Sequence, residues 1–208
     1  NPTGVMLEKE QLEYLVKAHE STLFVIDESY LPFADPLGEH SLINESGYDN
    51  VIVLSSMSKI YRIPGLRTGF LTGPALLAEK IMAHYQPWSV NALAQAVIED
   101  IFDHPDGIRP FYTTTEAFTR TEKALFLEQI GPVEHLEPIH ATTYFVLARL
   151  TGTMTAPDFC DRVGDGGILI RDCSNFEGLS DRFVRFSLSD RQANQRLARQ
   201  IRQVMGHA

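Results

Sequence analysis

The first third of the chain alternates between apolar residues at helical spacing and short continuous apolar runs. Between Leu7 and Val16, apolar residues recur among charged ones in the pattern of an amphipathic helix. Apolar runs at Thr22–Ile26, Val51–Leu54 and Gly69–Thr72 predict three strands. Since the first run is continuously hydrophobic, we expect a parallel strand buried on both faces. The alternation of helix and strand predicts a parallel sheet covered by helices.

The second half of the chain changes from long helices to shorter elements. Helical spacing dominates residues 75–129, with breaks at Gln86-Pro87 and at residues 104–107. Beyond Gly131-Pro132 the pattern predicts strands at Thr143–Leu150, Ile168–Ile170 and Phe183–Leu188 and helices at Ala156–Val163 and Asp190–Met205. We therefore expect an α/β domain over residues 1–130 that ends in a long connecting helix. A small α+β domain is expected over residues 131–208.

Composition narrows the classes of function. The 208 residues carry a net charge of -9, which argues against a nucleic-acid surface, because such a surface needs clustered Lys and Arg. No apolar run approaches the roughly 18 residues that cross a membrane. The two cysteines, Cys160 and Cys173, are too few for a disulfide framework, and the histidines lack paired spacing for a metal. We expect a cytoplasmic protein without metal, nucleic acid or membrane as partner.

The strongest chemical signal is Lys59, which follows the predicted strand Val51–Leu54 and has Ser56, Ser58 and Arg67 nearby. The carboxyl end of such a strand is where a loop opens a ligand site. A lysine amine forms a Schiff base with an aldehyde, and hydroxyls with a guanidinium bind a phosphate. The combination predicts a pyridoxal phosphate site. Taken alone, these residues fit equally well a surface lysine behind a serine helix cap.

Acidic residues at the end of the first predicted strand add to this interpretation. Asp27 ends that strand, and a carboxylate there keeps a pyridine nitrogen protonated, so that the ring accepts electrons. Tyr30 and Asn1 are candidates to donate to the phenolic oxygen of the same ring. Glu28 points to the opposite face of the strand, and we assign it a structural role.

Several motifs carry a family resemblance. In chain order they are Asn1–Gly4, Asp27–Tyr30, Ser56–Lys59, Pro64–Arg67, Gly167–Arg171 and Phe183–Ser187. Their order and spacing resemble the fold-type I aminotransferase superfamily. The resemblance implies a pyridoxal phosphate-dependent enzyme and a homodimer whose active sites borrow groups from the neighbour. It also implies that the chain is the carboxyl-terminal part of an enzyme and lacks the segment that supplies a phosphate-cradling loop.

Two arginines are the candidate substrate-binding residues. A charge at Arg185, within an apolar strand, is costly without an anionic partner, and a doubly anionic substrate would satisfy both Arg185 and Arg171. Surface pairing with Asp172 and Asp181 is the simpler alternative. By resemblance, one arginine binds the substrate carboxylate and the other its phosphate, with Arg185 favoured for the carboxylate.

The chain is similar to the branch of the superfamily that holds threonine-phosphate decarboxylases and histidinol-phosphate aminotransferases. Pro87-Trp88-Ser89 stands where the aminotransferases usually have Pro-Tyr-Asn, and Ile168–Leu179 resembles the decarboxylases. The resemblance implies decarboxylation of L-threonine O-3-phosphate to (R)-1-aminopropan-2-yl phosphate in cobalamin biosynthesis. Histidinol-phosphate aminotransferase, or another class I/II aminotransferase, is the alternative, because both reactions use the same groups. A sensing domain of a transcription regulator, or an inactive fragment, is a third hypothesis.

Overall fold

The computed structural model describes residues 1–43 and 47–206. The chain divides into two compact units, and each is described by itself. The Lys59 unit comprises residues 7–116, and the Arg185 unit comprises residues 1–6 together with residues 117 onward. The assignment of residues 1–130 and 131–208 to two domains stays a prediction.

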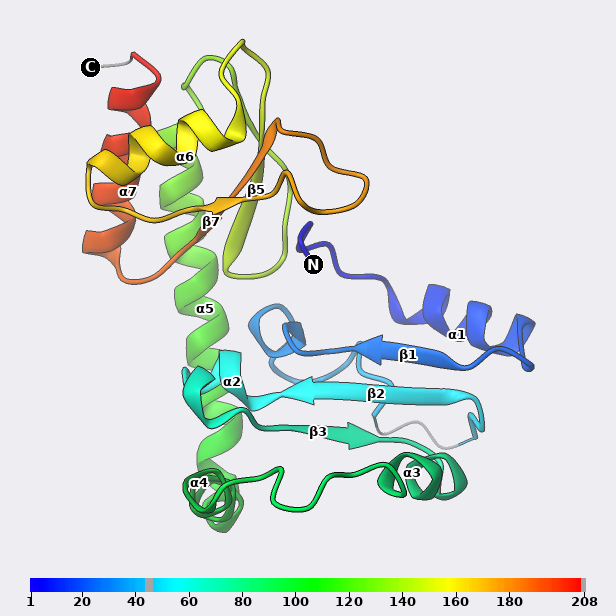
Figure 1. Cartoon of the computed structure of the whole chain (residues 1–208). Coiled ribbons are helices and arrows are strands. Elements are labelled where there is room, and N and C mark those ends of the chain that lie inside the picture. The colour runs from blue at the N-terminus through cyan, green and yellow to red at the C-terminus, as the bar shows by residue number, and fades with distance from the viewer. Residues whose placement is uncertain (44–46, 207–208) are drawn as a thin grey trace. The chain divides into compact units, whose positions relative to one another are not determined.

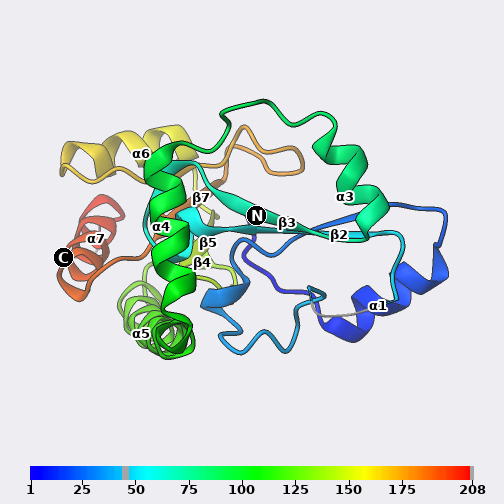
Figure 2. The same cartoon turned by 90° about the horizontal axis from the view of Figure 1, so that it is seen from below.

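The Lys59 unit contains a three-stranded sheet with helices on both sides. Its elements are α1 (Lys9–Ala18), β1 (Phe24–Asp27), η1 (Leu31–Phe33), β2 (Val51–Ser56), α2 (Met57–Ile60), η2 (Pro64–Leu66), β3 (Gly69–Thr72), α3 (Ala75–Met82), α4 (Ala92–Asp103) and the first part of α5 (Pro105–Ile130). Helices α1 and α3 lie on opposite sides of the sheet (Figure 2). The three strands and the helix expected near the amino terminus are confirmed, as is the mixed α/β class.

The sheet of the Lys59 unit is not entirely parallel. Strands β1 and β2 pair in parallel, with Asp27 opposite Leu54, whereas β2 and β3 pair antiparallel, with Ser56 opposite Gly69. The expectation of a parallel sheet therefore holds for β1 and β2 and is wrong for β3. The connection through α2 and η2 leaves the carboxyl end of β2 and enters β3 at that same end of the sheet. The chain therefore reverses direction without the crossover that parallel strands need.

Strand β1 is half-buried on one face, where Phe24 and Ile26 pack against an apolar cluster, and exposed on the other. Val16 of α1 forms an apolar cluster with Leu42, Val51 and Val53, and this cluster covers one face of the sheet. Val25 on the other face of β1 is 58% exposed, so the expectation of burial on both faces is wrong. A hydrophobic run shows that its residues favour burial, but a face of the strand is buried only where a second element covers it.

The Arg185 unit is an antiparallel sheet with helices packed on it (Figure 1). Its elements are the second part of α5, β4 (Leu136–Pro138), β5 (Phe145–Leu150), α6 (Ala156–Asp165), β6 (Arg171–Asp172), β7 (Phe183–Ser187) and α7 (Arg191–Val204), with strand order β4-β5-β7-β6. Phe126 of α5, Phe159 of α6 and Phe186 of β7 are fully buried in one apolar core. The predicted helix Asp190–Met205 is α7, and its cap is Asp190, whose Oδ1 accepts a hydrogen bond from the Ala193 amide at 2.9 Å.

One predicted strand of this unit is displaced. Residues 168–170 form no strand, and pairing starts at Arg171, which lies opposite Arg185. Leu169 is 95% exposed, whereas Ile168 and Ile170 are half-buried against the core, so the run alternates in burial although it does not pair with a strand. The short strand β4 was not predicted from the sequence. Within the part of the chain that the structure describes, no helix is long and apolar enough to cross a membrane.

Candidate active site

Lys59 lies on the single turn of helix that follows β2. Met57 and Ile60, three positions apart on α2, are both buried, and this anchoring leaves Lys59 half-buried on another side of the turn. Its Nζ donates a hydrogen bond to Ser56 Oγ at 3.4 Å. The local sequence therefore holds the amine against the last residue of the strand.

Tyr30 approaches the same amine from the loop after β1. Lys59 Nζ lies 6.0 Å from the centre of the Tyr30 ring, at the outer limit of a cation–π contact. Asp27, at the end of β1, is exposed, and its Oδ1 accepts a hydrogen bond from the Ser29 amide at 2.9 Å. Strand pairing places Asp27 beside Leu54, two residues before Ser56. Lys59, Ser56 and Tyr30 are thus brought together, with Asp27 on the adjacent strand end.

The predicted phosphate ligands Ser58 and Arg67 lie on different elements, Ser58 on α2 and Arg67 at the end of η2. Ser58 is buried, and its Oγ donates to the Thr68 carbonyl at 3.4 Å. Arg67 is exposed, with a left-handed backbone (φ 55°), and its Nη1 donates to the Pro64 carbonyl at 3.0 Å. Thr68 Oγ1 is buried without a hydrogen-bond partner among the described residues. The loop therefore keeps an exposed guanidinium and an unsatisfied hydroxyl beside each other in sequence.

In the Arg185 unit, Arg185 occupies a central strand. Its guanidinium carbon lies 4.8 Å from the centre of the Phe145 ring, and its Nη1 donates a hydrogen bond to Asn1 Oδ1. Its Nε is buried and lacks a hydrogen-bond partner among the described residues. Since an unpartnered buried N–H is costly, this atom is suited to an anionic ligand. Asn1, expected beside Tyr30 at the cofactor ring, is bound here by Arg185.

Arg171 lies beside Arg185 on the adjacent strand. The two residues are direct partners in the β6–β7 pairing. Arg171 Nη2 donates to Asn175 Oδ1 at 2.7 Å, and its guanidinium carbon lies 5.3 Å from the centre of the Phe176 ring. Like charges directly opposite each other in a sheet are destabilising, so an anion that contacts both would compensate for the repulsion.

The acidic residues that were the alternative partners of these arginines are engaged elsewhere. Asp181 pairs with Arg182 at 3.7 Å, and Asp172 Oδ1 accepts a hydrogen bond from the Ser174 amide at 2.8 Å. These contacts do not support surface pairing as the reason for the two cations.

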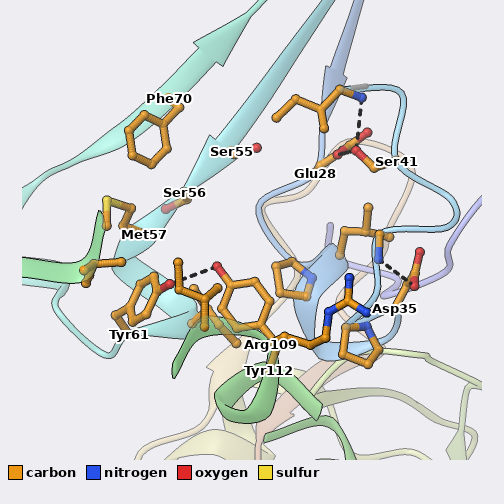
Figure 3. Close-up of a pocket in the computed structure, with 18 of the residues that line it drawn as sticks. Glu28, Asp35, Ser41, Ser55, Ser56, Met57, Tyr61, Phe70, Arg109 and Tyr112 are labelled. Carbon is orange, nitrogen blue, oxygen red and sulfur yellow. Dashed lines mark hydrogen bonds between the residues drawn. The ribbon is translucent and has the colours of Figure 1, made fainter. Parts of the chain in front are cut away.

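Sequence reasoning missed a pocket of about 490 Å³ in the Lys59 unit (Figure 3). The side chains of Tyr61, Arg109 and Tyr112 line it, and Tyr61 donates a hydrogen bond from its hydroxyl to the Tyr112 hydroxyl at 3.1 Å. Burial, followed by the contact with Tyr61, raises the pKa of Tyr112. Tyr61 also stacks on Phe111, with ring centres 5.4 Å apart. The aromatic pair Phe111-Tyr112 is the only sequence signal for this contact, because fifty residues separate it from Tyr61.

The family of the chain is decided by comparison with known proteins. The family model described as "Aminotransferase class I and II" matches residues 1–201. The chain belongs to this family. Members of the class I and II aminotransferase family depend on pyridoxal phosphate, which confirms the predicted cofactor and the predicted enzyme class.

Solved structures and a curated relative give the same family. The histidinol-phosphate aminotransferase from Clostridium acetobutylicum is 26% identical with a TM-score of 0.89, over 99% of this chain and 61% of that chain. L-threonine-O-3-phosphate decarboxylase from Porphyromonas gingivalis is 28% identical with a TM-score of 0.86, over 99% of this chain and 62% of that chain. The adenosylcobalamin biosynthesis bifunctional protein CobDQ of Leptospira interrogans is 28% identical over 95% of this chain and 22% of the relative. The chain spans about half the length of other curated relatives.

The residues of the Lys59 unit fit the family's cofactor. An amine for the carbonyl group, an exposed carboxylate for the ring nitrogen and a phenol for the ring oxygen are present at Lys59, Asp27 and Tyr30. The unsatisfied Thr68 hydroxyl and the exposed guanidinium of Arg67 add donors suited to a phosphate. The donor set therefore matches each functional group of pyridoxal phosphate.

Proposed function

We propose that the protein containing this chain decarboxylates L-threonine O-3-phosphate to (R)-1-aminopropan-2-yl phosphate in cobalamin biosynthesis. The observation that carries this proposal is the pairing of Arg171 with Arg185 on adjacent strands. Two opposed guanidinium groups suit a substrate with two anionic groups, a carboxylate and a phosphate. Similarity to a threonine-phosphate decarboxylase and to an adenosylcobalamin biosynthesis protein supports the choice.

Lys59 is the catalytic residue of this proposal. Its amine holds the cofactor and afterwards serves as proton donor and acceptor at the Cα of the substrate. Asp27 holds the ring nitrogen, and Tyr30 and Asn1 hold the phenolic oxygen. When bound, pyridoxal phosphate supplies a ring that accepts the electrons of a broken bond at Cα. The phosphate of the cofactor is assigned to residues Ser56, Ser58 and Arg67.

The arginines select the reaction by orienting the substrate. We assign the carboxylate to Arg185, whose buried Nε lacks a partner among the described residues, and the substrate phosphate to Arg171. With the cofactor bound, decarboxylation would require Arg185 to hold the substrate so that the bond from Cα to the carboxylate is the one that breaks, rather than the Cα–H bond.

Histidinol-phosphate aminotransferase is the second candidate, and structural similarity favours it. The TM-score to the Clostridium acetobutylicum aminotransferase, 0.89, exceeds the 0.86 to the Porphyromonas gingivalis decarboxylase. Incubation of the intact protein with L-threonine phosphate and no keto acid distinguishes the two. Release of carbon dioxide supports the decarboxylase, whereas turnover that depends strictly on 2-oxoglutarate supports the aminotransferase.

Lys59→Ala tests the core of the proposal. We expect activity to fall by at least about 10²–10⁴-fold, because the variant loses both the anchor and the proton-transfer group. Mass spectrometry after borohydride reduction should find the cofactor on Lys59 in the wild-type protein and nowhere in the variant. Lys80→Ala, an exposed lysine of α3, is the matched control and should leave both measurements unchanged. Full activity in Lys59→Ala would contradict the proposal.

The assembly and location of the protein are part of the same proposal. We infer a homodimer from the family resemblance, and a cytoplasmic location from the two free cysteines, Cys160 and Cys173. Analytical ultracentrifugation of the intact protein tests the dimer. A monomer with full activity would contradict shared active sites.

A further inference from the structure

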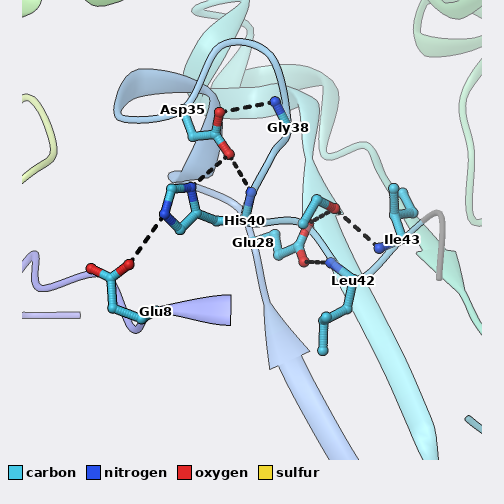
Figure 4. Close-up of polar contacts among 8 residues, drawn as sticks. Glu8, Glu28, Asp35, Gly38, His40, Leu42 and Ile43 are labelled. Atoms are coloured by element: carbon cyan, nitrogen blue, oxygen red, sulfur yellow. Dashed lines mark hydrogen bonds and ion pairs between the residues drawn. The ribbon is translucent and has the colours of Figure 1, made fainter. Parts of the chain in front are cut away.

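Glu28 joins the end of β1 to three other segments of the Lys59 unit. Its backbone amide donates to the Leu54 carbonyl at 2.8 Å, and its carbonyl accepts from the Leu31 amide at 3.0 Å. Its carboxylate accepts a hydrogen bond from Ser41 Oγ at 2.6 Å and another from the Leu42 amide at 2.9 Å (Figure 4). All four polar groups of this residue therefore have partners, and those partners lie in β2, η1 and the segment of residues 41–42.

The two carboxylate contacts close a loop. They connect residue 28 with residues 41–42, which are the two ends of the loop of residues 28–42 that follows β1. Ser41 and Leu42 are both buried, and Leu42 packs in the apolar cluster with Val51 and Val53. The carboxylate thus fixes the start of the loop to a point that the core already holds.

The residues assigned to the cofactor lie on either side of Glu28. Asp27 immediately precedes it, and Tyr30 lies within the turn that the Glu28 carbonyl forms with the Leu31 amide. A shift of the Glu28 backbone would therefore displace the Asp27 carboxylate and the Tyr30 ring together. The ring's position 6.0 Å from Lys59 Nζ depends on the same turn.

Other hydrogen bonds hold the outer part of the loop, residues 35–40. Asp35 accepts hydrogen bonds from the Gly38 amide at 3.0 Å and the His40 amide at 2.6 Å, and His40 Nε2 lies 3.3 Å from Glu8 Oε2 (Figure 4). These contacts shape residues 35–40 and leave the base of the loop to Glu28. Loss of the Glu28 carboxylate is therefore not compensated by the Asp35 contacts.

We propose that Glu28 is a positioning residue that sets the Asp27 carboxylate and the Tyr30 ring relative to Lys59. This inference rests on the proposed function, since it assigns those residues to the cofactor. It goes beyond a role in stability, because a residue that only stabilises the loop would leave the properties of the bound cofactor unchanged.

The test compares Glu28→Ala and Glu28→Gln in the intact, cofactor-loaded protein. The amide of Gln keeps an acceptor for the Leu42 amide, whereas Ala removes both acceptors. In Glu28→Ala we expect kcat to fall about tenfold or more, because small displacements of reacting groups are costly. The pH at which the absorbance of the bound cofactor changes should shift as well, and Glu28→Gln should recover most of both effects.

Hydrogen exchange in the cofactor-free protein supplies a readout that is independent of activity. The Leu42 amide should exchange about tenfold faster or more in Glu28→Ala, because its acceptor is gone. Glu137→Ala is the control, since Glu137 forms an exposed ion pair with Arg149 at 2.7 Å in the Arg185 unit. It should change none of the three measurements.

The outcomes separate the inference from the proposed function. If Leu42 exchanges faster in Glu28→Ala while kcat and the absorbance titration match those of the wild type, Glu28 is only structural and the inference is overturned. If the wild-type protein does not carry the cofactor on Lys59, the proposed function fails and the inference falls with it. Changes in all three measurements, with rescue by Gln, support both.

Discussion

The two units hold their candidate site residues in different ways. In the Arg185 unit, Arg185 lies on a central strand whose neighbour Phe186 is fully buried with Phe126 and Phe159. The Lys59 unit has a smaller apolar cluster and leaves large apolar side chains exposed, with Leu76 at 74% and Trp88 at 96%. Apolar packing therefore supports one set of candidates far more than the other.

Polar side chains have a larger part in the Lys59 unit. Asn50 Nδ2 donates to the carbonyls of Val16, His19 and Thr22 at 3.1–3.3 Å, which joins the end of α1 to the start of β2. Glu28 and Asp35 act similarly on the loop that carries Tyr30. A site on loops therefore depends on individual hydrogen bonds, whereas a site on a packed sheet depends on the core beneath it.

The largest effect should come from the core of the Arg185 unit. Phe186→Ala should lower the free energy of unfolding by about 3–5 kcal/mol, because it leaves a cavity among buried side chains. Leu71→Ala in β3 of the Lys59 unit, where Leu71 is 37% exposed, should cost only about 1 kcal/mol. Urea denaturation of the intact protein measures both. Equal losses of stability in the two variants would contradict the claim that apolar packing matters more in the Arg185 unit.

A smaller effect is expected from Glu122, whose buried carboxylate joins two helices of the Arg185 unit. Glu122 is 3% exposed and accepts hydrogen bonds from Arg191 Nε at 2.8 Å and Asn194 Nδ2 at 3.1 Å, which connect α5 and α7. Glu122→Ala should cost about 2–3 kcal/mol, because the buried Asn194 amide loses a partner. Glu137→Ala, which breaks an exposed ion pair, should stay within about 0.5 kcal/mol. A cost for Glu122→Ala as small as that of the control would count against this account.

Helix caps allow a matched comparison between the units. Asp190 caps α7, and Asn91 caps α4 by accepting from the Ala94 amide at 3.0 Å, so replacement of either by Ala should cost about 1 kcal/mol. Asn91 Nδ2 also donates to the Leu66 carbonyl at 3.2 Å, next to Arg67. Equilibrium dialysis should therefore find weaker binding of pyridoxal phosphate in Asn91→Ala alone. Equal binding in both variants would show that this loop does not depend on the Asn91 contact.

The smallest predicted effect is pH-dependent and concerns His40. Its ring nitrogens face Asp35 at 3.2 Å and Glu8 at 3.3 Å, so only the doubly protonated ring donates to both. Desolvation lowers the pKa of His40, but Asp35 and Glu8 outweigh it, and the net pKa is raised. The stabilisation is therefore complete below the unfolded pKa of about 6.5 and is lost as pH rises through the folded pKa.

Unfolding of the intact protein across roughly pH 5–8 measures this contribution. We expect a loss below about 1 kcal/mol towards high pH in the wild type and none in His40→Gln. At lower pH, protonation of Asp35 causes a second loss of stability. Burial raises its pKa, but hydrogen bonds from residues 39–40 lower it more, so its contribution is lost as pH falls through the lowered pKa. The same slope in His40→Gln as in the wild type would assign the pH dependence to other groups.

Much of the secondary structure was predictable because its signals are local. Strand β3 begins and ends at the expected residues, and α7 starts within one residue of the predicted helix, since the start of a helix and a short apolar run are both encoded within a few residues. The direction of β3 and the exposure of Val25 were not predictable from periodicity, because both depend on which element covers or pairs with a strand.

The candidate site likewise has parts that local sequence predicts and parts that it does not. Lys59, Ser56 and Tyr30 belong to compact motifs, and their proximity follows from two adjacent strand ends. The register that sets Arg171 opposite Arg185 could not be read from the sequence, because a strand was expected three residues too early. The contacts of Glu28 with Ser41 and Leu42 likewise bridge thirteen and fourteen residues, beyond any local pattern.

Arg62 and Arg67 both have a left-handed backbone, with φ of 55°. An L-residue there is less favourable than glycine by roughly 1–2 kcal/mol, which makes both positions attractive to an engineer seeking a more heat-resistant protein. At Arg62 the exchange for glycine removes no group that we assign to the cofactor. At Arg67 the same exchange would remove the guanidinium assigned to the cofactor phosphate. A screen that measures heat resistance but not activity would therefore select a variant that binds the cofactor poorly.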